Sequence, residues 1–260
     1  MEVLSFDVCG KMAHFRKYYA NNTAFSYSLP PRTTVMGILA AILGYERDSY
    51  YEALSSVHLR VGIRILQPIK KNFHRLNFLS IKSMGDALEG TGDFTGADGR
   101  IQTPFEIVTG LHLGTDLVQY RFFLAAGAND NGEFEKIKNS VLHLQQKFNV
   151  TLGTASFTAW IQNSLLTDHV EAMIGDGFIP LHAAIPSSAI ENLNFPQEDD
   201  NFLEEELLPA DFVGNRNREL GKLVRVIFST HGIPFSAKLN ASYFPVPDKD
   251  GHIQNILFLE

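Results

Sequence analysis

The sequence predicts an α+β fold, with a ferredoxin-like domain at residues 1–165 and a C-terminal β-rich lobe at residues 166–260. The order of periodic segments in the first part is strand, helix, strand, strand, helix, strand, which is the split βαβ arrangement of RNA-recognition-type folds. Strand-like segments alone follow it. The chain of 260 residues is 45% hydrophobic, which is enough to bury a substantial core.

The opening strand and the helix after it have clear periodic patterns. Leu4, Phe6 and Val8 alternate with their neighbours until Gly10, which predicts a strand. Residues 11–28 are basic and aromatic and have no regular period. Two prolines then precede a helix whose apolar residues recur at helical spacing from Val35 to Ile42 and which ends at Gly44; Thr33 or Thr34 is expected to cap it.

A short helix is expected at residues 48–54, followed by a strand at residues 57–65. In that strand the apolar residues alternate with His58, Arg60, Gly62 and Arg64. This alternation predicts a sheet with one buried face and one open, positive face.

The second half of the domain begins with a glycine-rich stretch from about residue 82 to 104, which is too long for an ordinary connection. Strands are predicted at residues 105–109 and 117–125. A helix at residues 133–146 would bury the stripe Phe134, Ile137, Val141 and Leu144. A last strand is expected at residues 149–161, with a bulge or a close backbone approach at Leu152–Gly153.

The C-terminal lobe is predicted to contain strands near residues 223–229, 241–246 and 253–259, and an acidic polar loop at residues 197–211. We find no internal repeat in the chain.

Charge is segregated along the chain, although the net charge is −7. Residues 11–82 hold eleven lysines and arginines against three acidic residues, whereas residues 148–215 hold eleven acidic residues and no lysine or arginine. One surface could therefore attract phosphates while another repels them or docks a basic protein. Solvated faces are the simpler interpretation of such blocks, above all for the run Glu204–Glu206.

Several classes of protein find no support in the sequence. No segment approaches the roughly 20 apolar residues of a membrane span, and no signal peptide is recognisable, so a cytoplasmic protein is expected. The single cysteine, Cys9, is expected to be a packed small hydrophobe. There is no phosphate-binding loop and no nucleophile elbow, and no histidine pair has metal-ligand spacing, so neither a cofactor nor a metal is predicted.

Two stretches of the chain resemble a known family. Residues 6–17 read Phe-Asp-Val-Cys-Gly-Lys-Met-Ala-His-Phe-Arg-Lys, and residues 30–44 read Pro-Pro-Arg-Thr-Thr-Val-Met-Gly-Ile-Leu-Ala-Ala-Ile-Leu-Gly. They resemble the opening of the fifth CRISPR-associated (Cas) protein family of the RAMP superfamily, in its type I-B form. Residues 102–106 and 152–159 fit the same family more loosely.

The resemblance implies a RAMP-type ferredoxin-like domain that binds the 5′ handle of the crRNA in a Cascade effector complex, in antiviral defence. The implied partners are the crRNA, the repeated backbone subunit and the large subunit, with target DNA reached only through the complex. It also implies a long thumb hairpin that packs on the backbone subunit and kinks the guide, and residues 82–104 lie where that thumb would be.

Single-stranded RNA is held by cations on its phosphates and by stacking on its bases, and the chain offers both. Arg32, Thr33 and Thr34 stand at a helix N-terminus, which favours an anion. The candidate RNA-binding residues are Lys11, His14, Arg16, Lys17, Tyr18, Arg32, Thr33, Thr34, Lys70, Lys71, Arg75, Arg100 and Gln102.

Two alternatives stay open. Type I-C members of the family cleave precursor crRNA, and His14, Lys17 and Tyr18, or Tyr19, could form a metal-independent endoribonuclease site. The resemblance is to the type I-B form, in which a separate nuclease is expected, so a non-enzymatic role is preferred. The third possibility is a protein-docking scaffold without RNA contact, because residues 168–211 are acidic.

Overall fold

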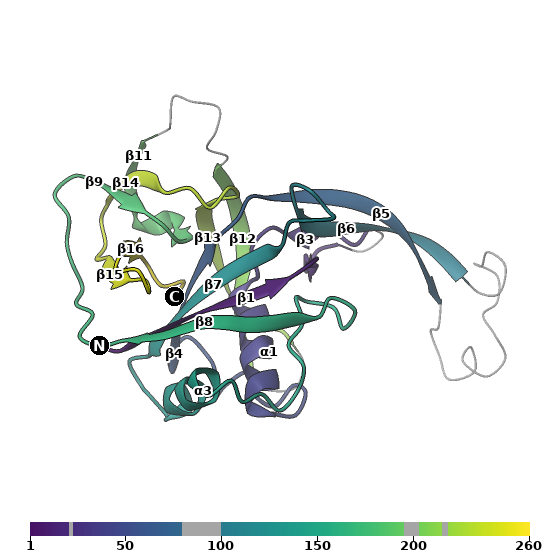
Figure 1. Cartoon of the computed structure of the whole chain (residues 1–260), viewed down its shortest axis with the longest axis horizontal. Helices are drawn as coiled ribbons and strands as arrows, with labels where there is room; N and C mark the ends of the chain where they lie inside the picture. The colour runs from purple at the N-terminus through teal and green to yellow at the C-terminus, as the bar shows by residue number, and fades with distance from the viewer. Residues whose placement is uncertain (21–22, 80–99, 195–202, 215–217) are drawn as a thin grey trace.

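The computed structural model describes residues 1–20, 23–79, 100–194, 203–214 and 218–260. Its central sheet contains β1 (Val3–Gly10), β4 (Leu59–Ile65), β7 (Val118–Ala126) and β8 (Ala159–Thr167) in the order β4-β7-β1-β8. All three neighbouring pairs are antiparallel. Helix α1 (Arg32–Leu43) connects β1 to β4, and α3 (Glu133–Leu142) connects β7 to β8. Both helices lie below the sheet in Figure 1, so the fold is α+β as predicted.

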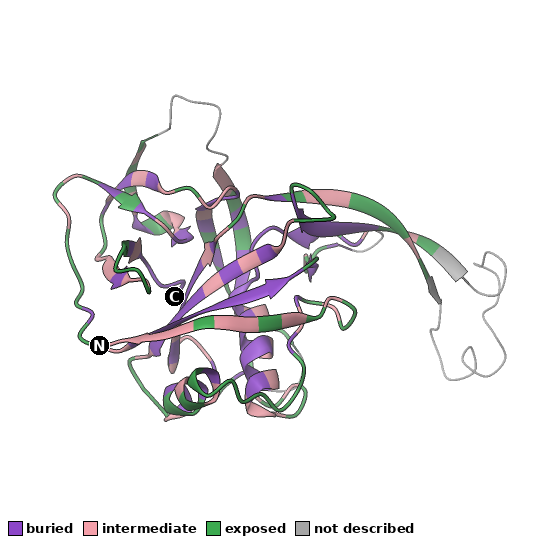
Figure 2. Ribbon diagram, viewed as in Figure 1, coloured by how far each residue is buried: buried purple, intermediate pink, exposed green. Residues whose placement is uncertain are grey.

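The face of the sheet toward the helices is the main core. Leu4, Phe6 and Val8 are fully buried there, and the Phe6 and Phe122 rings meet edge-on at 5.6 Å. Burying one such side chain contributes roughly 1.5–3 kcal/mol. Figure 2 shows β1 buried along its whole length. The strand alternation thus identified the core face correctly.

The opposite face of the sheet is covered, so the open positive face predicted from residues 57–65 is wrong. Val3, Phe123 and Ala125 pack there against Val246, Ile256 and Phe258 of the C-terminal lobe. Arg64 donates to Gln254 Oε1 at 2.9 Å, and Arg60 pairs with Glu260 at 2.8 Å. These two cations hold the lobe to the sheet.

The helix α1 begins at Arg32, two or three residues earlier than a cap at Thr33 or Thr34 would place it, and it is not capped by a threonine. Its N-cap is Pro31, whose carbonyl oxygen accepts the N–H groups of Thr34 and Val35. At the other end Gly44 adopts φ +82° and donates its N–H to Ala40 O, which confirms the predicted glycine stop.

Three other boundaries differ from the prediction. Residues 48–54 form turns rather than a helix, and α3 stops at Leu142, so that Leu144 is 66% exposed at φ +51° while Phe134, Ile137 and Val141 are buried. The last strand of the sheet is displaced from residues 149–161 to 159–167, because residues 149–158 fold back as a turn bridged between Thr151 and Thr158.

A long two-stranded hairpin projects from the body (Figure 1). It is formed by β5 (Ile69–Leu79) and β6 (Arg100–Gly110), which pair from Ile69–Gly110 to Leu79–Arg100. Residues 80–99, which include most of the predicted thumb at 82–104, lie outside the described residues. At the root, β6 also pairs with residues 11–28, here called the opening segment, through the bridges Ala13–Val108 and Ala24–Phe105.

The C-terminal lobe is rich in strands, as expected. Its sheets have the orders β10-β13-β12, β11-β14-β9 and β15-β16. The strands are β9 (Phe178–Leu181), β10 (Ile185–Pro186), β11 (Ile190–Asn194), β12 (Leu203–Phe212), β13 (Leu220–Ser229), β14 (Phe235–Leu239), β15 (Phe244–Pro247) and β16 (Ile253–Ile256), with a 3₁₀ turn at Ser187–Ala189. Most of the predicted acidic loop is the strand β12, while residues 197–202 lie outside the described residues. Leu208 and Val226 belong to the same apolar cluster as α1, so the core continues across residue 165.

The lone Cys9 is fully buried, as predicted, and burial raises the pKa of its thiol to about 12. No helix in the described part of the chain is long and apolar enough to span a membrane.

His182 joins β9 to β16 and makes stability depend on pH. The Asn255 N–H donates to His182 Nδ1 at 3.1 Å, so this nitrogen must be unprotonated. Burial, together with the nearby Arg64, lowers the pKa of His182 to about 4. The unfolded chain, with a pKa of about 6.5, binds this proton first, so stability falls as the pH drops from about 6.5 to about 4.

We expect protonation of His182 to lower the free energy of unfolding by up to about 1.4 kcal/mol per pH unit in that window. Urea denaturation at pH 7 and pH 4.5 should show a smaller loss in His182→Gln than in the parent. His74→Gln, an exposed histidine of the hairpin, is the control and should behave as the parent. Equal losses in His182→Gln and the parent would contradict this assignment.

Candidate nucleic-acid interface

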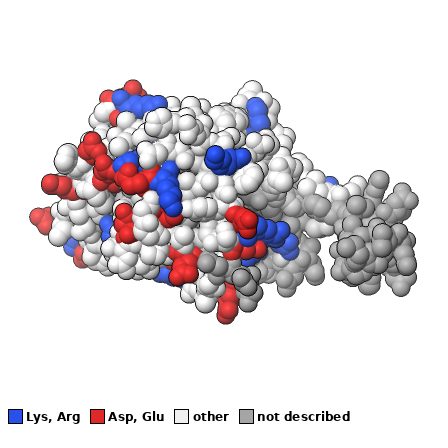
Figure 3. All heavy atoms as spheres, turned by 90° about the horizontal axis from the view of Figure 1, so that it is seen from below, with Lys and Arg blue, Asp and Glu red and all other residues white. Residues whose placement is uncertain are grey.

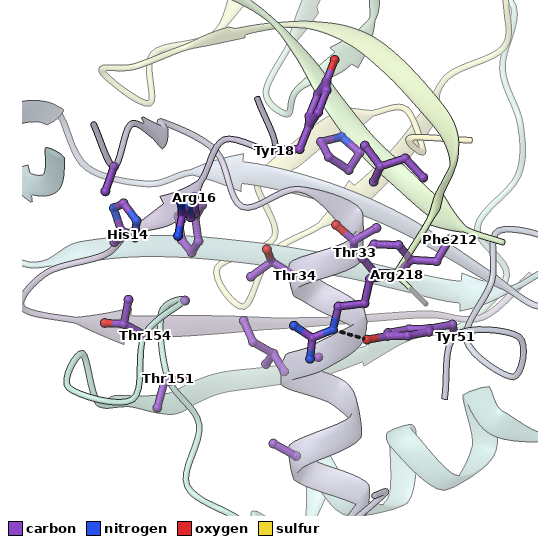
Figure 4. Close-up of a pocket in the computed structure, with 18 of the residues that line it drawn as sticks. His14, Arg16, Tyr18, Thr33, Thr34, Tyr51, Thr151, Thr154, Phe212 and Arg218 are labelled. Atoms are coloured by element: carbon purple, nitrogen blue, oxygen red, sulfur yellow. Dashed lines mark hydrogen bonds between the residues drawn. The ribbon is translucent and has the colours of Figure 1, made fainter. Parts of the chain in front are cut away.

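A cleft of about 860 Å³ lies over α1. Its floor is one face of the helix, formed by Thr33, Thr34, Gly37, Ile38 and Ala41. Figure 4 shows His14, Arg16, Thr151 and Thr154 on one side of α1, Tyr51 and Phe212 on the other, and the Arg218 guanidinium group in front of the helix. The cleft therefore joins three distant parts of the sequence.

The first wall is built from the opening segment. β2 (Phe15–Arg16) pairs with β3 (Ser26–Tyr27), which buries Phe15 and leaves Arg16 exposed at the cleft. Arg16 Nη2 donates to Ala20 O at 3.1 Å, so the guanidinium is oriented but keeps other N–H groups. Beside it Tyr18 is 47% exposed and offers a face for stacking.

His14 lies in the same wall, but it is only 3% exposed. Its ring packs 3.9 Å from the Phe105 ring, and Nδ1 lies 2.7 Å from Glu106 O, so Nδ1 carries the proton and donates. Burial is the main cause that lowers the pKa of His14. The residue is therefore a neutral imidazole fixed between the opening segment and β6.

The loop at residues 149–154 supports this wall. The His14 N–H donates to Leu152 O at 3.0 Å, and Gly153, at φ +96°, lies so close that a Cβ there would come 1.8 Å from His14 O. This confirms the close backbone approach predicted at Leu152–Gly153.

Arg32 does not point into the cleft, which corrects the predicted phosphate seat of Arg32, Thr33 and Thr34. Its side chain is 1% exposed and pairs with Asp211 at 2.6 Å. It also donates to the carbonyl oxygens of Leu54 and Leu59 at 2.8 and 2.7 Å. Thr33 and Thr34 do line the cleft, where their hydroxyl groups can contact a ligand.

Lys17 and Lys71 are paired with an acidic residue of the lobe. Glu206 Oε1 lies 3.1 Å from Lys17 Nζ and 3.5 Å from Lys71 Nζ. Burial alone would lower the pKa of Lys17, but the Glu206 carboxylate raises it overall. Since Glu206 is 8% exposed, the run Glu204–Glu206 is not merely a solvated face.

The other predicted contacts lie away from the cleft. Lys11, Lys70, Arg75 and Gln102 are exposed, three of them on the hairpin arms, and none of these described side chains lines the cleft. The side chain of Arg100 lies outside the described part of the structure. Figure 3, which views the face carrying the helices, shows cations and carboxylates interspersed rather than one basic field.

The second wall was not predicted from sequence. Arg218 Nε lies 2.8 Å from Asp48 Oδ1 and 3.0 Å from the Tyr51 hydroxyl oxygen. The hydrogen bond to Asp48 is the main cause that raises the pKa of Arg218. The only sequence signal was the pair of arginines, Arg216 and Arg218, that ends the cation-free stretch.

One group of possible metal ligands occurs among the described residues, at the turn between β15 and β16. Ligand atoms of Asp248, Asp250 and His252 lie within 4.8 Å of one another. Asp248 Oδ1 already accepts the backbone N–H groups of Asp250 and His252, so the group has a turn-forming role.

Comparison with known proteins decides the family. A family model described as CRISPR-associated protein (Cas_Cas5) matches residues 3–212. The chain belongs to this family. The match covers the opening segment, the hairpin, the central sheet and β12 of this Cas5 family member. None of the curated proteins compared with the chain matches it.

Solved structures agree at the level of the fold. A CRISPR protein from Archaeoglobus fulgidus is 14% identical over 100% of both chains, with a TM-score of 0.55. A chain of a CRISPR RNA-guided surveillance complex is 12% identical over 90% of each chain, with a TM-score of 0.50. At these identities the likeness of the Cas5 family member to them concerns fold alone.

Proposed function

We propose that this Cas5 family member is the subunit of a type I-B Cascade that binds the crRNA 5′ handle in the cleft over α1. The observation that carries the proposal is the composition of that cleft. It combines the exposed Arg16 and Tyr18 of the opening segment with the hydroxyl groups of Thr33 and Thr34. Cations, stacking faces and hydroxyl donors are what single-stranded RNA requires.

The arrangement of the sheet supports a RAMP-type ferredoxin-like domain as the platform. The order β4-β7-β1-β8, with helices in the two crossovers, agrees with a split βαβ unit. The β5–β6 hairpin suits the thumb that would contact the backbone subunit, and the lobe would leave its outer surface for the large subunit. The crRNA and these subunits are the proposed partners, in the cytoplasm.

Binding rather than cleavage is favoured by the state of the candidate catalytic residues. His14 is buried with Nδ1 committed to Glu106 O, and Lys17 is held by Glu206. A general acid or base must reach the phosphate, and a charge stabiliser must be free to meet it. Site-specific cleavage of repeat RNA by the purified chain in EDTA, lost in His14→Ala, would instead favour the endoribonuclease.

We expect Arg16→Glu to weaken binding of handle RNA by at least about tenfold, because it removes a phosphate contact and adds repulsion. The measurement is handle protection and RNA affinity of the assembled complex. Lys238→Glu, which breaks a surface pair with Glu191 in the lobe, is the control and should bind normally. Unchanged affinity in Arg16→Glu would reject the cleft as the handle site.

A further inference from the structure

The second wall of the cleft carries chemistry that the opening segment cannot explain. Arg218 belongs to the connection between β12 and β13 of the C-terminal lobe, yet it lines the same cleft as Arg16. In Figure 4 its guanidinium group lies in front of α1, and Arg16 lies to the left of the helix. We propose that Arg218, positioned by Tyr51 and Asp48, makes the phosphate contact on this wall, so that the C-terminal lobe supplies part of the RNA site. This inference rests on the proposed function.

The guanidinium group is held along one edge. Nε and Nη2 both face Asp48 Oδ1, at 2.8 and 2.7 Å, and Nε also lies 3.0 Å from the Tyr51 hydroxyl oxygen. Nη1 has no acceptor within the described ranges. An arginine carries five N–H donors in a planar fork, so the remaining donors can meet a phosphate without losing this support.

The support itself is rigid. The Tyr51 ring is 2% exposed and packs 4.5 Å from the Phe212 ring and 4.8 Å from the Tyr50 ring. Its hydroxyl group also hydrogen-bonds to Asp48. An arginine that is oriented before binding loses less side-chain freedom when the ligand arrives.

The backbone at Arg218 points to the same conclusion. Its φ is +49°, in the left-handed region that residues other than glycine rarely adopt. Such a conformation costs free energy and is often found where a side chain must be aimed at a ligand. The side chain is also 47% exposed and lines the cleft, so a ligand in the cleft can reach it.

The charges around Arg218 leave a positive balance, because Asp48 is shared between Arg218 at 2.7 Å and Arg47 at 3.5 Å. No lysine or arginine stands between residues 148 and 215, so the long acidic stretch offers no competing cation to this wall. Asp48 cancels part of the charge of Arg218. A phosphate between Arg218 and the hydroxyl groups of Thr33 and Thr34 would neutralise the remaining positive charge. The RNA backbone carries one such phosphate at each nucleotide.

The test uses the full chain, a labelled handle RNA derived from the associated CRISPR repeat, and a scrambled RNA of equal length. Affinity is measured over a series of salt concentrations. We expect Arg218→Gln to weaken binding about tenfold and to reduce the log–log salt slope by about 0.7, the value for one phosphate of a single strand. Tyr51→Phe keeps the charge but loses the supporting hydroxyl group, so it should weaken binding about threefold with the slope unchanged.

Arg225→Gln is the matched control, because Arg225 is an exposed arginine of β13 paired with Glu205 at 3.1 Å. It should stay within about twofold of the parent. If Arg218→Gln equals Arg225→Gln while Arg16→Glu still weakens binding, the assignment of Arg218 is wrong and the proposed function stands. If Arg16→Glu also binds normally, the proposed function itself fails. Thermal unfolding of each variant separates lost binding from lost folding. If Arg218→Gln does not fold, the RNA affinity of Tyr51→Phe tests the assignment of Arg218.

Discussion

Arg32→Met is expected to lower the free energy of unfolding by about 3–5 kcal/mol, since it removes one partner of a buried ion pair. The guanidinium group satisfies Asp211 and the carbonyl oxygens of Leu54, Leu59 and Ala210 at 2.6 to 3.2 Å. Methionine fills similar space but donates nothing, so these acceptors lose their partner. Arg32→Lys should also lower the free energy of unfolding, because a single ammonium group cannot contact all the acceptors that the planar guanidinium group contacts at once.

Urea denaturation followed by circular dichroism measures the loss. Arg16→Met, at the exposed arginine of β2, is the control and should change stability by less than about 0.5 kcal/mol. The double variant Arg32→Met with Asp211→Asn tests the pair directly, since removing the carboxylate charge should recover part of the loss. Normal stability with lost RNA binding in Arg32→Met would restore Arg32 as a phosphate ligand and contradict its burial.

The contrast between Arg32 and Arg16 shows which features could be predicted from the sequence and which could not. Strand and helix periodicity is local, so β1, α1, β4 and β7 were predicted within a few residues. The role of a single cation is not local. Arg32 finds its counter-ion 179 residues away, and the prolines and helical spacing that placed it at a helix start carried no information about β12.

The errors in strand position have a similar origin. β5 has no clean alternation of apolar residues, and it is a strand because all eleven residues pair with β6. Residues 149–158 have strand-like composition, but Gly153 and the bridge between Thr151 and Thr158 turn the chain back before β8 begins. Pairing partners decided both cases, and sequence patterns do not identify them.

The acidic stretch shows the same limit for the candidate site. Its charge suggested a docking surface or a solvated loop, yet Glu206 and Asp211 lie on β12 and hold Lys17 and Arg32. With Lys71, which also pairs with Glu206, three of the predicted RNA contacts are used to attach the lobe. Among the described residues, the arginines and lysines left at the cleft are Arg16, which the opening motif identified, and Arg218, which it could not.

Gly153→Ala should be the most damaging single methyl group in the described structure, with an expected loss of at least about 3 kcal/mol. The added Cβ would lie 1.8 Å from His14 O, and the backbone at φ +96° already excludes most side chains. The loop cannot retreat freely, because Leu152 O accepts the His14 N–H at 3.0 Å.

Two glycines separate the causes of that loss. Gly251→Ala introduces backbone strain without a steric clash, since Gly251 has φ +83° and open space where its Cβ would be. Gly114→Ala introduces neither strain nor a clash. Unfolding free energies should therefore fall in the order Gly114→Ala, Gly251→Ala, Gly153→Ala, and the difference between the last two variants measures the clash with His14.

Because His14 lies two residues before Arg16, any movement that relieves this clash shifts the first wall of the cleft. The folded fraction of Gly153→Ala should therefore also bind handle RNA more weakly. Equal losses for Gly153→Ala and Gly251→Ala would show that the loop yields without moving His14, and the folded Gly153→Ala should then bind handle RNA as the parent does.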